Sequence, residues 1–250
     1  MNEYIKNLNR IEFVVTMACT GKCKHCSEGE HTGCTGHIDK DIAVASIREV
    51  CEHYKIESLM TFGGEPLLYP DVVCAIHRTA KELGIPQRDL ITNGYFTKDT
   101  DRIAEVVKQL EESGVCQILL SVDAFHQETI PLEPVKYFAR CVANSKINIK
   151  LSPAWLVSKE DNNPYNVKTR EVLKAFEDLE IPEGSGNVIF PSGNALKYLG
   201  EYFEENVEYS SPYEEDPKDI RAIGFSPDGE VLNGNVYRKG ILDILRDYQP

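Results

Sequence analysis

The sequence predicts an α/β protein built around a parallel sheet, and two observations lead to this class. From residue 11 to about residue 190, short β-rich apolar runs alternate with longer segments whose apolar residues recur every three or four positions. The run 117–122 is apolar almost without alternation, as expected of a strand covered on both faces. Repeated strand–helix units imply right-handed crossovers and parallel strands. Such a sheet lies open or curls into a full or partial barrel.

The expected elements follow one another in a regular order. Strands are expected at 11–16, 58–62, 89–92, 117–122, 147–157 and 187–190. Helices are expected between them at 40–54, 70–83, 99–113, 133–145 and 166–179. Asp39 stands where the N-cap of the first helix would be, and Asp99 or Thr100 where that of the third would be. Pro70 suits the first turn of the second helix, where its missing N–H costs nothing.

Composition limits the class of protein. The chain has 250 residues, 42% of them hydrophobic and 27% charged, as an ordinary globular protein has. No run approaches the roughly 18 apolar residues that cross a bilayer, and the first residues lack an export pattern. The formal net charge of −13 argues against a broad basic surface for nucleic acid. We therefore expect a cytoplasmic protein without membrane contact, whose eight cysteines are ligands and reduced thiols.

Three cysteines are closely spaced directly after the first expected strand. Cys19, Cys23 and Cys26 form the pattern C-x3-C-x2-C. They lie at the carboxyl end of that strand, the edge where parallel sheets carry their chemistry. Three thiolates suit a cubane iron–sulfur cluster with one iron left open for a ligand that is not protein. A closed zinc site is the alternative, because Cys34, His31 or His37 could supply a fourth ligand.

Other strand ends carry polar or glycine residues. Gly63-Gly64-Glu65-Pro66 follows the second strand, where glycines permit close approach of a ligand and a carboxylate could pair with an ammonium group. Thr92-Asn93-Gly94 follows the third strand, and Ser121 and Asp123 lie at the end of the fourth. A carboxylate there could hold ribose hydroxyls. His126 is a candidate catalytic residue, as a substrate contact or proton donor, or else makes a structural hydrogen bond.

The two motifs together resemble those of the radical S-adenosylmethionine (radical SAM) superfamily. Its hallmark is C-x3-C-x2-C with an aromatic or imidazole residue before the last cysteine, a place held here by His25. The Gly-Gly-Glu-Pro segment is a second family motif, placed independently of the first. The resemblance covers roughly residues 10–190. It implies a core domain over residues 1–190 that forms a partial (β/α)6 TIM-type barrel, with a C-terminal extension over residues 191–250.

The resemblance also implies cofactors. Cys19, Cys23 and Cys26 would hold one [4Fe–4S] cluster, whose open iron binds the amino and carboxylate groups of S-adenosylmethionine. Further positions match cofactor-binding segments of the family: Gly63, Gly64 and Glu65 for the methionine amino group, Ser121, Asp123 and Asn93 for the methionyl or ribose part, and His25 and Ile189 beside the adenine. The zinc alternative explains the cysteines but not the glycine motif, so the pair of motifs favours the cluster.

The C-terminal extension departs from the strand–helix rhythm. Residues 202–219 are acidic and are expected to form a solvated loop. Residues 220–225 and 230–232 are expected to form a β-hairpin around the Pro227-Asp228-Gly229 turn, followed by a helix over 241–246. This tail resembles that of the SPASM and twitch subfamilies, whose cysteines bind auxiliary clusters. No cysteine follows Cys141 here, so we expect a remnant that closes the barrel without a metal.

The expected function is that of a radical SAM enzyme. In that family a reduced cluster cleaves S-adenosylmethionine to methionine and a 5′-deoxyadenosyl radical, which abstracts hydrogen from a substrate. An electron donor such as flavodoxin or ferredoxin is an implied partner. The tail favours peptide or natural-product modification, and a small-molecule or nucleoside substrate is the alternative. A non-catalytic iron–sulfur or zinc module for binding or sensing is the alternative from another class.

Overall fold

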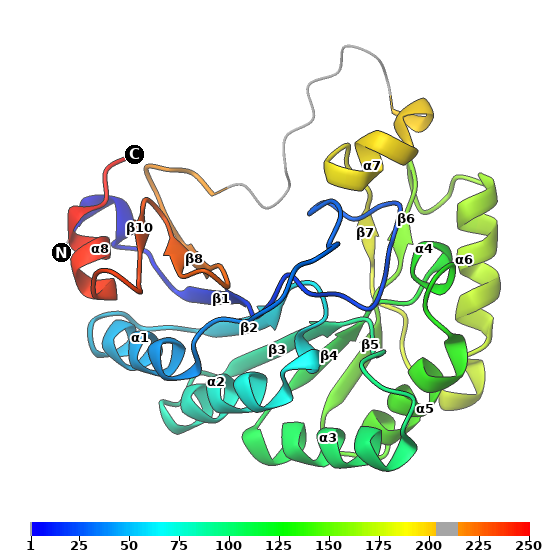
Figure 1. Ribbon diagram of the computed structural model, residues 1–250, viewed down its shortest axis with the longest axis horizontal. Helices are drawn as coiled ribbons and strands as arrows, with labels where there is room; N and C mark the ends of the chain where they lie inside the picture. The colour runs from blue at the N-terminus through cyan, green and yellow to red at the C-terminus, as the bar shows by residue number, and fades with distance from the viewer. Residues whose placement is uncertain (1, 204–214) are drawn as a thin grey trace.

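A parallel six-stranded sheet forms the centre of the computed structural model, which describes residues 2–203 and 215–250 (Figure 1). The strand order is β5-β4-β3-β2-β1-β8. Its strands are β1 (Arg10–Val14), β2 (Ser58–Phe62), β3 (Gln87–Thr92), β4 (Gln117–Leu120), β5 (Asn148–Leu151) and β8 (Ala222–Phe225). Two smaller sheets pair β6 (Ala154–Trp155) with β7 (Asn187–Val188), and β9 (Glu230–Val231) with β10 (Gly234–Asn235). The architecture is consistent with the expected partial barrel.

The α-helices follow the strands in the predicted order. They are α1 (Lys40–His53), α2 (Pro70–Glu82), α3 (Thr100–Ser113), α4 (Ala124–Gln127), α5 (Leu132–Ala143), α6 (Pro164–Lys174), α7 (Gly193–Tyr198) and α8 (Ile241–Asp247). Short 3₁₀ helices are η1 (Glu3–Ile5), η2 (Pro66–Leu68), η3 (Glu177–Leu179) and η4 (Gly200–Tyr202). The predicted caps are confirmed: the Asp39 carboxylate accepts from the first-turn amides of α1, and Asp99 does the same for α3.

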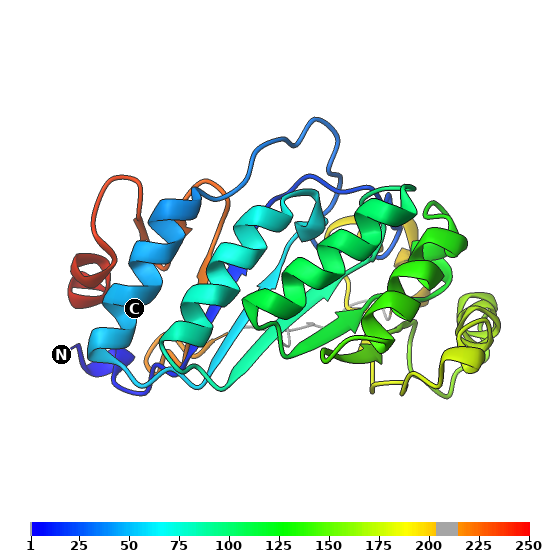
Figure 2. The same cartoon turned by 90° about the horizontal axis from the view of Figure 1, so that it is seen from below.

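Helices α1, α2, α3 and α5 lie side by side across one face of the sheet (Figure 2). Alternate strand residues, among them Ile11, Leu59 and Leu90, point to this face and are buried in one core with the helices. The sheet therefore has one face that is packed against helices and another that bears the intervening side chains.

No helix among the described residues combines the length and apolar character needed to cross a membrane.

Two expectations about the edges of the sheet are wrong. The strand expected over 147–157 divides into β5 and β6 around Pro153, which has no N–H for the ladder. The strand expected over 187–190 becomes β7, which pairs in parallel with β6 and not within the main sheet. Leu151 and Glu183 form an isolated bridge just before this pairing, so the chain after α6 runs beside the end of β5.

The predicted C-terminal hairpin is also wrong in its pairing. β8 pairs in parallel with β1, and Phe225 stacks on Phe13 with ring centroids 4.6 Å apart. The Pro-Asp-Gly turn is present, since the Ser226 N–H donates to the Glu230 carbonyl, but the antiparallel ladder joins β9 to β10. The helix expected over 241–246 is confirmed as α8. Of the expected acidic loop, residues 204–214 lie outside the described residues.

Candidate cluster and cofactor site

Residues 19–26, which we name the cluster loop, follow β1 at the carboxyl edge of the sheet. Cys19, Cys23 and Cys26 are all free thiols, buried or half-buried. Nitrogen atoms approach two of the sulfurs: the Gly21 amide donates to Cys19 Sγ over 3.3 Å, and His31 Nε2 lies 3.2 Å from Cys26 Sγ. Hydrogen bonds to sulfur are a regular feature of iron–sulfur sites. The donor set therefore fits an iron–sulfur cluster.

Burial governs the protonation of these thiols. It raises the pKa of Cys19 to about 11 and holds the pKa of Cys23 well above its usual range. Both therefore carry protons at neutral pH in the absence of a metal. Since iron binds thiolates, loading of the loop releases these protons.

Gly63 and Gly64 hold the cluster loop close to the end of β2. The Gly64 amide donates to the Thr16 carbonyl over 2.7 Å, and the next amide, of Glu65, donates to the Ala18 carbonyl over 2.8 Å. A Cβ on Gly63 would lie 2.4 Å from the Thr16 oxygen, and one on Gly64 would lie 2.3 Å from the Ala18 oxygen. The motif thus needs glycine because two backbone segments touch there.

The Glu65 carboxylate is fully buried and joins the ends of β2 and β3. It accepts from the Thr92 hydroxyl over 2.7 Å, the Asn93 amide over 2.8 Å and the Leu67 amide over 2.9 Å. Burial raises the pKa of Glu65 to about 7, while these three donors favour the charged form. The side chain considered for a ligand ammonium group thus already has three protein partners.

Asn93 connects the end of β3 to the cluster loop. Its Nδ2 lies 3.2 Å from Thr20 Oγ1 and 3.7 Å from Cys19 Sγ, and its Oδ1 accepts from the Tyr95 amide. The Thr20 hydroxyl in turn donates to the Tyr95 carbonyl over 2.7 Å. Asn93 is therefore close to the first cysteine, and Thr20 is a contact that the sequence did not indicate.

Asp123 and His126 form a buried acid–imidazole pair after β4. Asp123 caps α4 by accepting from the Phe125 and His126 amides, and its Oδ2 also accepts from the Ala154 amide over 3.0 Å. His126 Nδ1 lies 2.8 Å from Asp123 Oδ2. Burial opposes charge on His126, but the carboxylate outweighs burial and raises the pKa of the imidazole. Reciprocally, this pair holds the pKa of Asp123 well below its usual range despite burial.

His126 also adjoins the cluster loop. Its ring centroid lies 4.9 Å from that of His25, which is itself 4.9 Å from the ring of Phe125. Ligand atoms of Cys23, His25 and His126 all lie within 4.8 Å of one another. The fourth-strand acid therefore reaches the cluster loop through an imidazole.

Ser121 and Ile189, two further candidate cofactor residues, have different surroundings. Ser121 is half-buried at the end of β4, and its amide donates to the Thr92 carbonyl. Ile189 is buried in a second apolar cluster together with Phe125, Ala195 and Leu199. Tyr165 stacks on Phe125 with centroids 4.7 Å apart. The candidate adenine residue is thus packed beside a ring that His25 also touches.

Residues 192–194 bind the cluster loop from a distant part of the chain. Asn194 donates its amide to the Cys26 carbonyl over 2.9 Å and its Nδ2 to the Cys23 carbonyl over 3.1 Å. The Ser192 hydroxyl donates to the Ser27 carbonyl over 3.1 Å. Sequence reasoning missed this contact, because a Ser-Gly-Asn run reads only as a turn.

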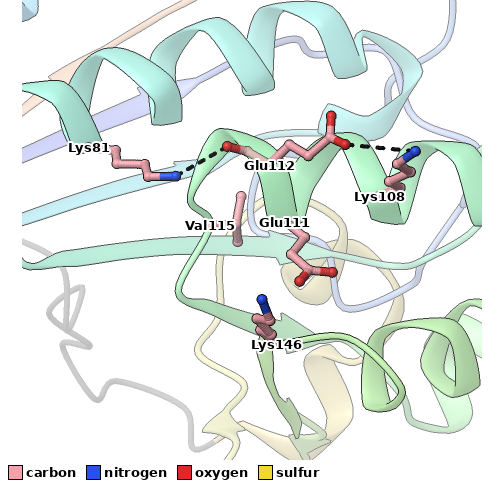
Figure 3. Close-up of a pocket in the computed structure, with 6 residues that line it drawn as sticks. All are labelled: Lys81, Lys108, Glu111, Glu112, Val115 and Lys146. Atoms are coloured by element: carbon pink, nitrogen blue, oxygen red, sulfur yellow. Dashed lines mark hydrogen bonds and ion pairs between the residues drawn. The ribbon is translucent and has the colours of Figure 1, made fainter.

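The remaining cysteine of the adjoining loop, Cys34, is half-buried, and its amide donates to the His31 carbonyl. A separate surface depression of about 450 Å³ lies at the opposite edge of the sheet (Figure 3). There Lys81 Nζ donates to the Glu112 carbonyl, and Lys108 pairs with the Glu112 carboxylate. The candidate chemistry is at the other, cysteine-bearing edge.

Comparison with known proteins defines the class. The family model described as "Radical SAM superfamily" matches residues 13–146, more than half of the chain. The chain therefore belongs to the radical SAM superfamily. It is an enzyme, and its cofactors are a [4Fe–4S] cluster and S-adenosylmethionine. The expectations on family, enzyme class and cofactors are confirmed, and the alternative of a non-catalytic module is not supported.

Individual relatives differ in what they act on. A probable GTP 3′,8-cyclase from Saccharolobus islandicus is 26% identical over 219 residues, which span 82% of this chain and 68% of that protein. The structure of Streptococcus suis SuiB bound to precursor peptide SuiA has a TM-score of 0.61 at 14% identity, over 97% of this chain and 65% of that one. BtrN in complex with AdoMet and 2-DOIA has a TM-score of 0.54 at 15% identity, over 96% and 82%. The two structural likenesses bear on the fold alone.

Proposed function

We propose that this enzyme modifies a peptidyl substrate by reductive cleavage of S-adenosylmethionine at a cluster held by Cys19, Cys23 and Cys26. The observation that carries the proposal is the set of three free thiols, two of them approached by nitrogen atoms, beside Gly63–Glu65 at one sheet edge. When bound and reduced, the cluster supplies one electron that cleaves the cofactor to methionine and the 5′-deoxyadenosyl radical that takes hydrogen from the substrate. A flavodoxin or ferredoxin is the proposed electron donor.

The residues around the loop are proposed to position the cofactor. Gly63 and Gly64 offer backbone for the methionine amino group, and the buried Glu65 fixes that backbone by its bonds to the third strand. Asn93 and Ser121 offer polar groups at the next two strand ends. Ile189 and His25 offer apolar and aromatic contact for the adenine. Water exclusion follows from the small apolar cluster around Phe125.

Asp123 and His126 are proposed to act as a unit. The Asp123 oxygens are occupied by backbone amides and by His126, so its contact with a ligand would pass through the imidazole. The imidazole side chain is 15% exposed, enough for one edge to meet a cofactor or substrate atom. His126 would thus donate or hold a proton at Nε2, with its ring fixed by the carboxylate.

The charges near the loop offer few partners for a triphosphate. Lys24 pairs with Glu128 over 2.7 Å and Lys197 with Glu30 over 2.6 Å, whereas Lys22 is exposed and has no ion pair within the described residues. A triphosphate needs unpaired cations or a metal. A peptide substrate is also consistent with the kind of ligand named for SuiB. A nucleotide substrate is the second candidate, favoured by the likeness to GTP 3′,8-cyclases.

The two-domain division also remains a proposal: a core over residues 1–190, and an extension over 191–250 that closes the barrel. In support, α7 contacts the cluster loop.

The test begins with anaerobic reconstitution, which should give about four irons per chain. Dithionite should then release 5′-deoxyadenosine from S-adenosylmethionine, and the Cys26→Ala variant should do neither. The electron paramagnetic resonance spectrum of the reduced cluster should shift when the cofactor is added. Absence of 5′-deoxyadenosine from cluster-loaded protein would refute the proposal.

The substrate class is tested with GTP. We expect GTP to leave the rate of 5′-deoxyadenosine release unchanged and to yield no cyclised nucleotide by mass spectrometry. A GTP-dependent product would instead establish the second candidate.

A further inference from the structure

Side chains on the sheet face that the helices leave free form a row across all six strands of the main sheet. The parallel registers place Glu12 beside Met60, Met60 beside Asp89, and Asp89 beside Gln117. Gln117 is in turn beside Asn148, and Gly224 of β8 is beside Glu12. In-register neighbours on parallel strands point to the same face. The row therefore runs from β8 to β5 on one face.

This face is the one opposite α1, α2, α3 and α5 (Figures 1 and 2). The residues that alternate with the row, including Ile11, Leu90 and Ile118, belong to the core that the helices cover. The row is partly accessible, since Glu12 and Met60 are half-buried and Asn148, at its β5 end, is exposed. A Cβ on Gly224 would meet nothing within 4 Å, which leaves space beside Glu12.

Asp89 occupies the centre of the row and has one oxygen without a partner. The residue is only 3% exposed. Its Oδ2 accepts from Gln87 Nε2 over 2.7 Å, whereas its Oδ1 has no hydrogen-bond partner within residues 2–203 and 215–250. A buried carboxylate that lacks a cation or a full set of donors is unfavourable. This oxygen can therefore accept a hydrogen bond from a group outside the described residues.

The basic side chains near Asp89 either bind other groups or do not contact it. Arg10 pairs with Glu12 and also donates to Met60 Sδ over 3.9 Å. Arg10, Lys150 and Arg88 influence Asp89 only through space, Arg10 most strongly, and the Arg88 guanidinium donates to backbone carbonyls on the other side of the strand. No ion pair to Asp89 occurs among the described residues. A cation from outside would complete the site.

Asp89 lies at a fixed distance from the carboxyl end of the sheet, where the cofactor is proposed to bind. Asp89 is four residues before Asn93 on the same strand. With a strand rise of about 3.3 Å per residue, the two Cα atoms are about 13 Å apart. Glu12 is two strands from Asp89, about 10 Å across the sheet. A substrate could therefore reach the cofactor with one end while a charged group several bonds away meets the row.

We propose that Asp89, supported by Glu12, binds a positively charged nitrogen of the substrate, a lysine side chain or the amino terminus of a peptide. This assignment rests on the proposed peptidyl function and names the part of the substrate that the site recognises. The cationic nitrogen donates to Asp89 Oδ1. Glu12, which pairs with Arg10 and lies about 10 Å from Asp89, adds only a weaker long-range attraction. The bond sets how far the reacting carbon lies from the anchored charge.

The test uses cluster-loaded protein and a fluorescent primary ammonium probe, dansylcadaverine, followed by fluorescence anisotropy. Its N-acetylated analogue has the same ring and chain without the charge. We expect the ammonium probe to bind at least about tenfold more tightly than the neutral analogue, as loss of a charged partner from a buried pair implies. Equal binding of the two probes to the native protein would overturn the proposal without any variant.

Variants then locate the site. Asp89→Asn keeps the shape of the side chain and should weaken the ammonium probe about tenfold, while Glu12→Gln should weaken it less. Glu52→Gln on α1 removes an exposed carboxylate elsewhere and should leave binding unchanged. Weakening by Glu52→Gln equal to that by Asp89→Asn would mean attraction to the whole acidic surface and would refute the assignment.

Further experiments distinguish a lysine side chain from an amino terminus as the source of the charge. They also distinguish failure of this site from failure of the proposed function. The tripeptide acetyl-Gly-Lys-Gly-amide supplies only a side-chain ammonium group, and Gly-Gly-Gly-amide only an amino terminus, so competition by one identifies the source. Failure of both to compete, when the ammonium probe itself is bound, would exclude a peptide cation. Release of 5′-deoxyadenosine in the same preparation without ammonium binding would refute this site and leave the proposed function standing. Absence of that release would refute the function itself.

Discussion

Asn194 on α7 holds two carbonyl oxygens of the cluster loop, those of Cys23 and Cys26, at 3.1 and 2.9 Å. The two contacts come from one residue, through its side chain and its backbone amide. They fix the turn that carries the second and third cysteines. A segment near residue 194 therefore shapes a loop that is 171 positions earlier in the chain.

Replacing Asn194 with Ala should loosen the cluster loop without unfolding the protein. The variant loses the side-chain bond to the Cys23 carbonyl but keeps the backbone bond to Cys26, so the expected cost is about 1–3 kcal/mol. The variant should lose iron to a chelator several times faster than the native protein. The electron paramagnetic resonance lines of its reduced cluster should broaden. Leu196→Ala, on an exposed position of the same helix, is the control. Equal iron loss from both variants would contradict the role of Asn194.

The Gly64→Ala variant tests the close contact between the two motifs. The added Cβ would lie 2.3 Å from the Ala18 carbonyl oxygen, so the backbone before Cys19 must move. We expect less than about one iron per chain after reconstitution, against about four for the native protein. In the control Gly200→Ala, the added Cβ meets nothing within 4 Å and should leave cluster loading unchanged. Normal loading of Gly64→Ala would show that the contact can relax.

The fold was predictable from the sequence only in part. Local patterns located the first four strands, the caps Asp39 and Asp99 and the cysteine and glycine motifs, because neighbouring residues determine them. The pairing of β8 with β1 escaped prediction, since the Pro227–Gly229 turn suits a hairpin equally well. Its partner was set by Phe225 stacking on Phe13, a contact between distant segments.

The candidate site divides in the same way. Motif spacing indicated which residues gather at the sheet edge, but not which way each carboxylate points. Glu65 faces Thr92 and Asn93, and Asp123 faces Ala154, because burial requires a carboxylate to find donors. Asn194 gave no local signal at all. Tertiary packing decides these contacts.

Replacing Glu65 with Gln should lower stability as well as cofactor binding. The carboxylate accepts three hydrogen bonds in a fully buried position. The amide of glutamine has one oxygen and one NH₂ group, and the NH₂ group cannot accept a hydrogen bond from these donors. Loss of one such bond should cost about 2 kcal/mol in the free energy of unfolding, measured with urea. Glu82→Gln, an exposed ion-pair residue, should cost less than about 1 kcal/mol. Equal stability of Glu65→Gln and the native protein would show that this network is not structural.

His77 should make the protein less stable as the pH falls below 6.5. Burial lowers the pKa of this imidazole to about 3, against 6.5 for the unfolded chain, so between these values the unfolded state binds more protons. The contribution of His77 to stability is fully present above pH 6.5 and falls by about 1.4 kcal/mol for each unit of pH below it. The His77→Gln variant should therefore have a slope smaller than that of the native protein by about 1.4 kcal/mol per unit between pH 6.5 and 5.5, because buried groups such as His25 still contribute, whereas the exposed-residue control His53→Gln should keep the native slope. Urea unfolding of cluster-loaded protein at several pH values measures the difference. An identical slope in native protein and His77→Gln would mean that another group governs the acid sensitivity.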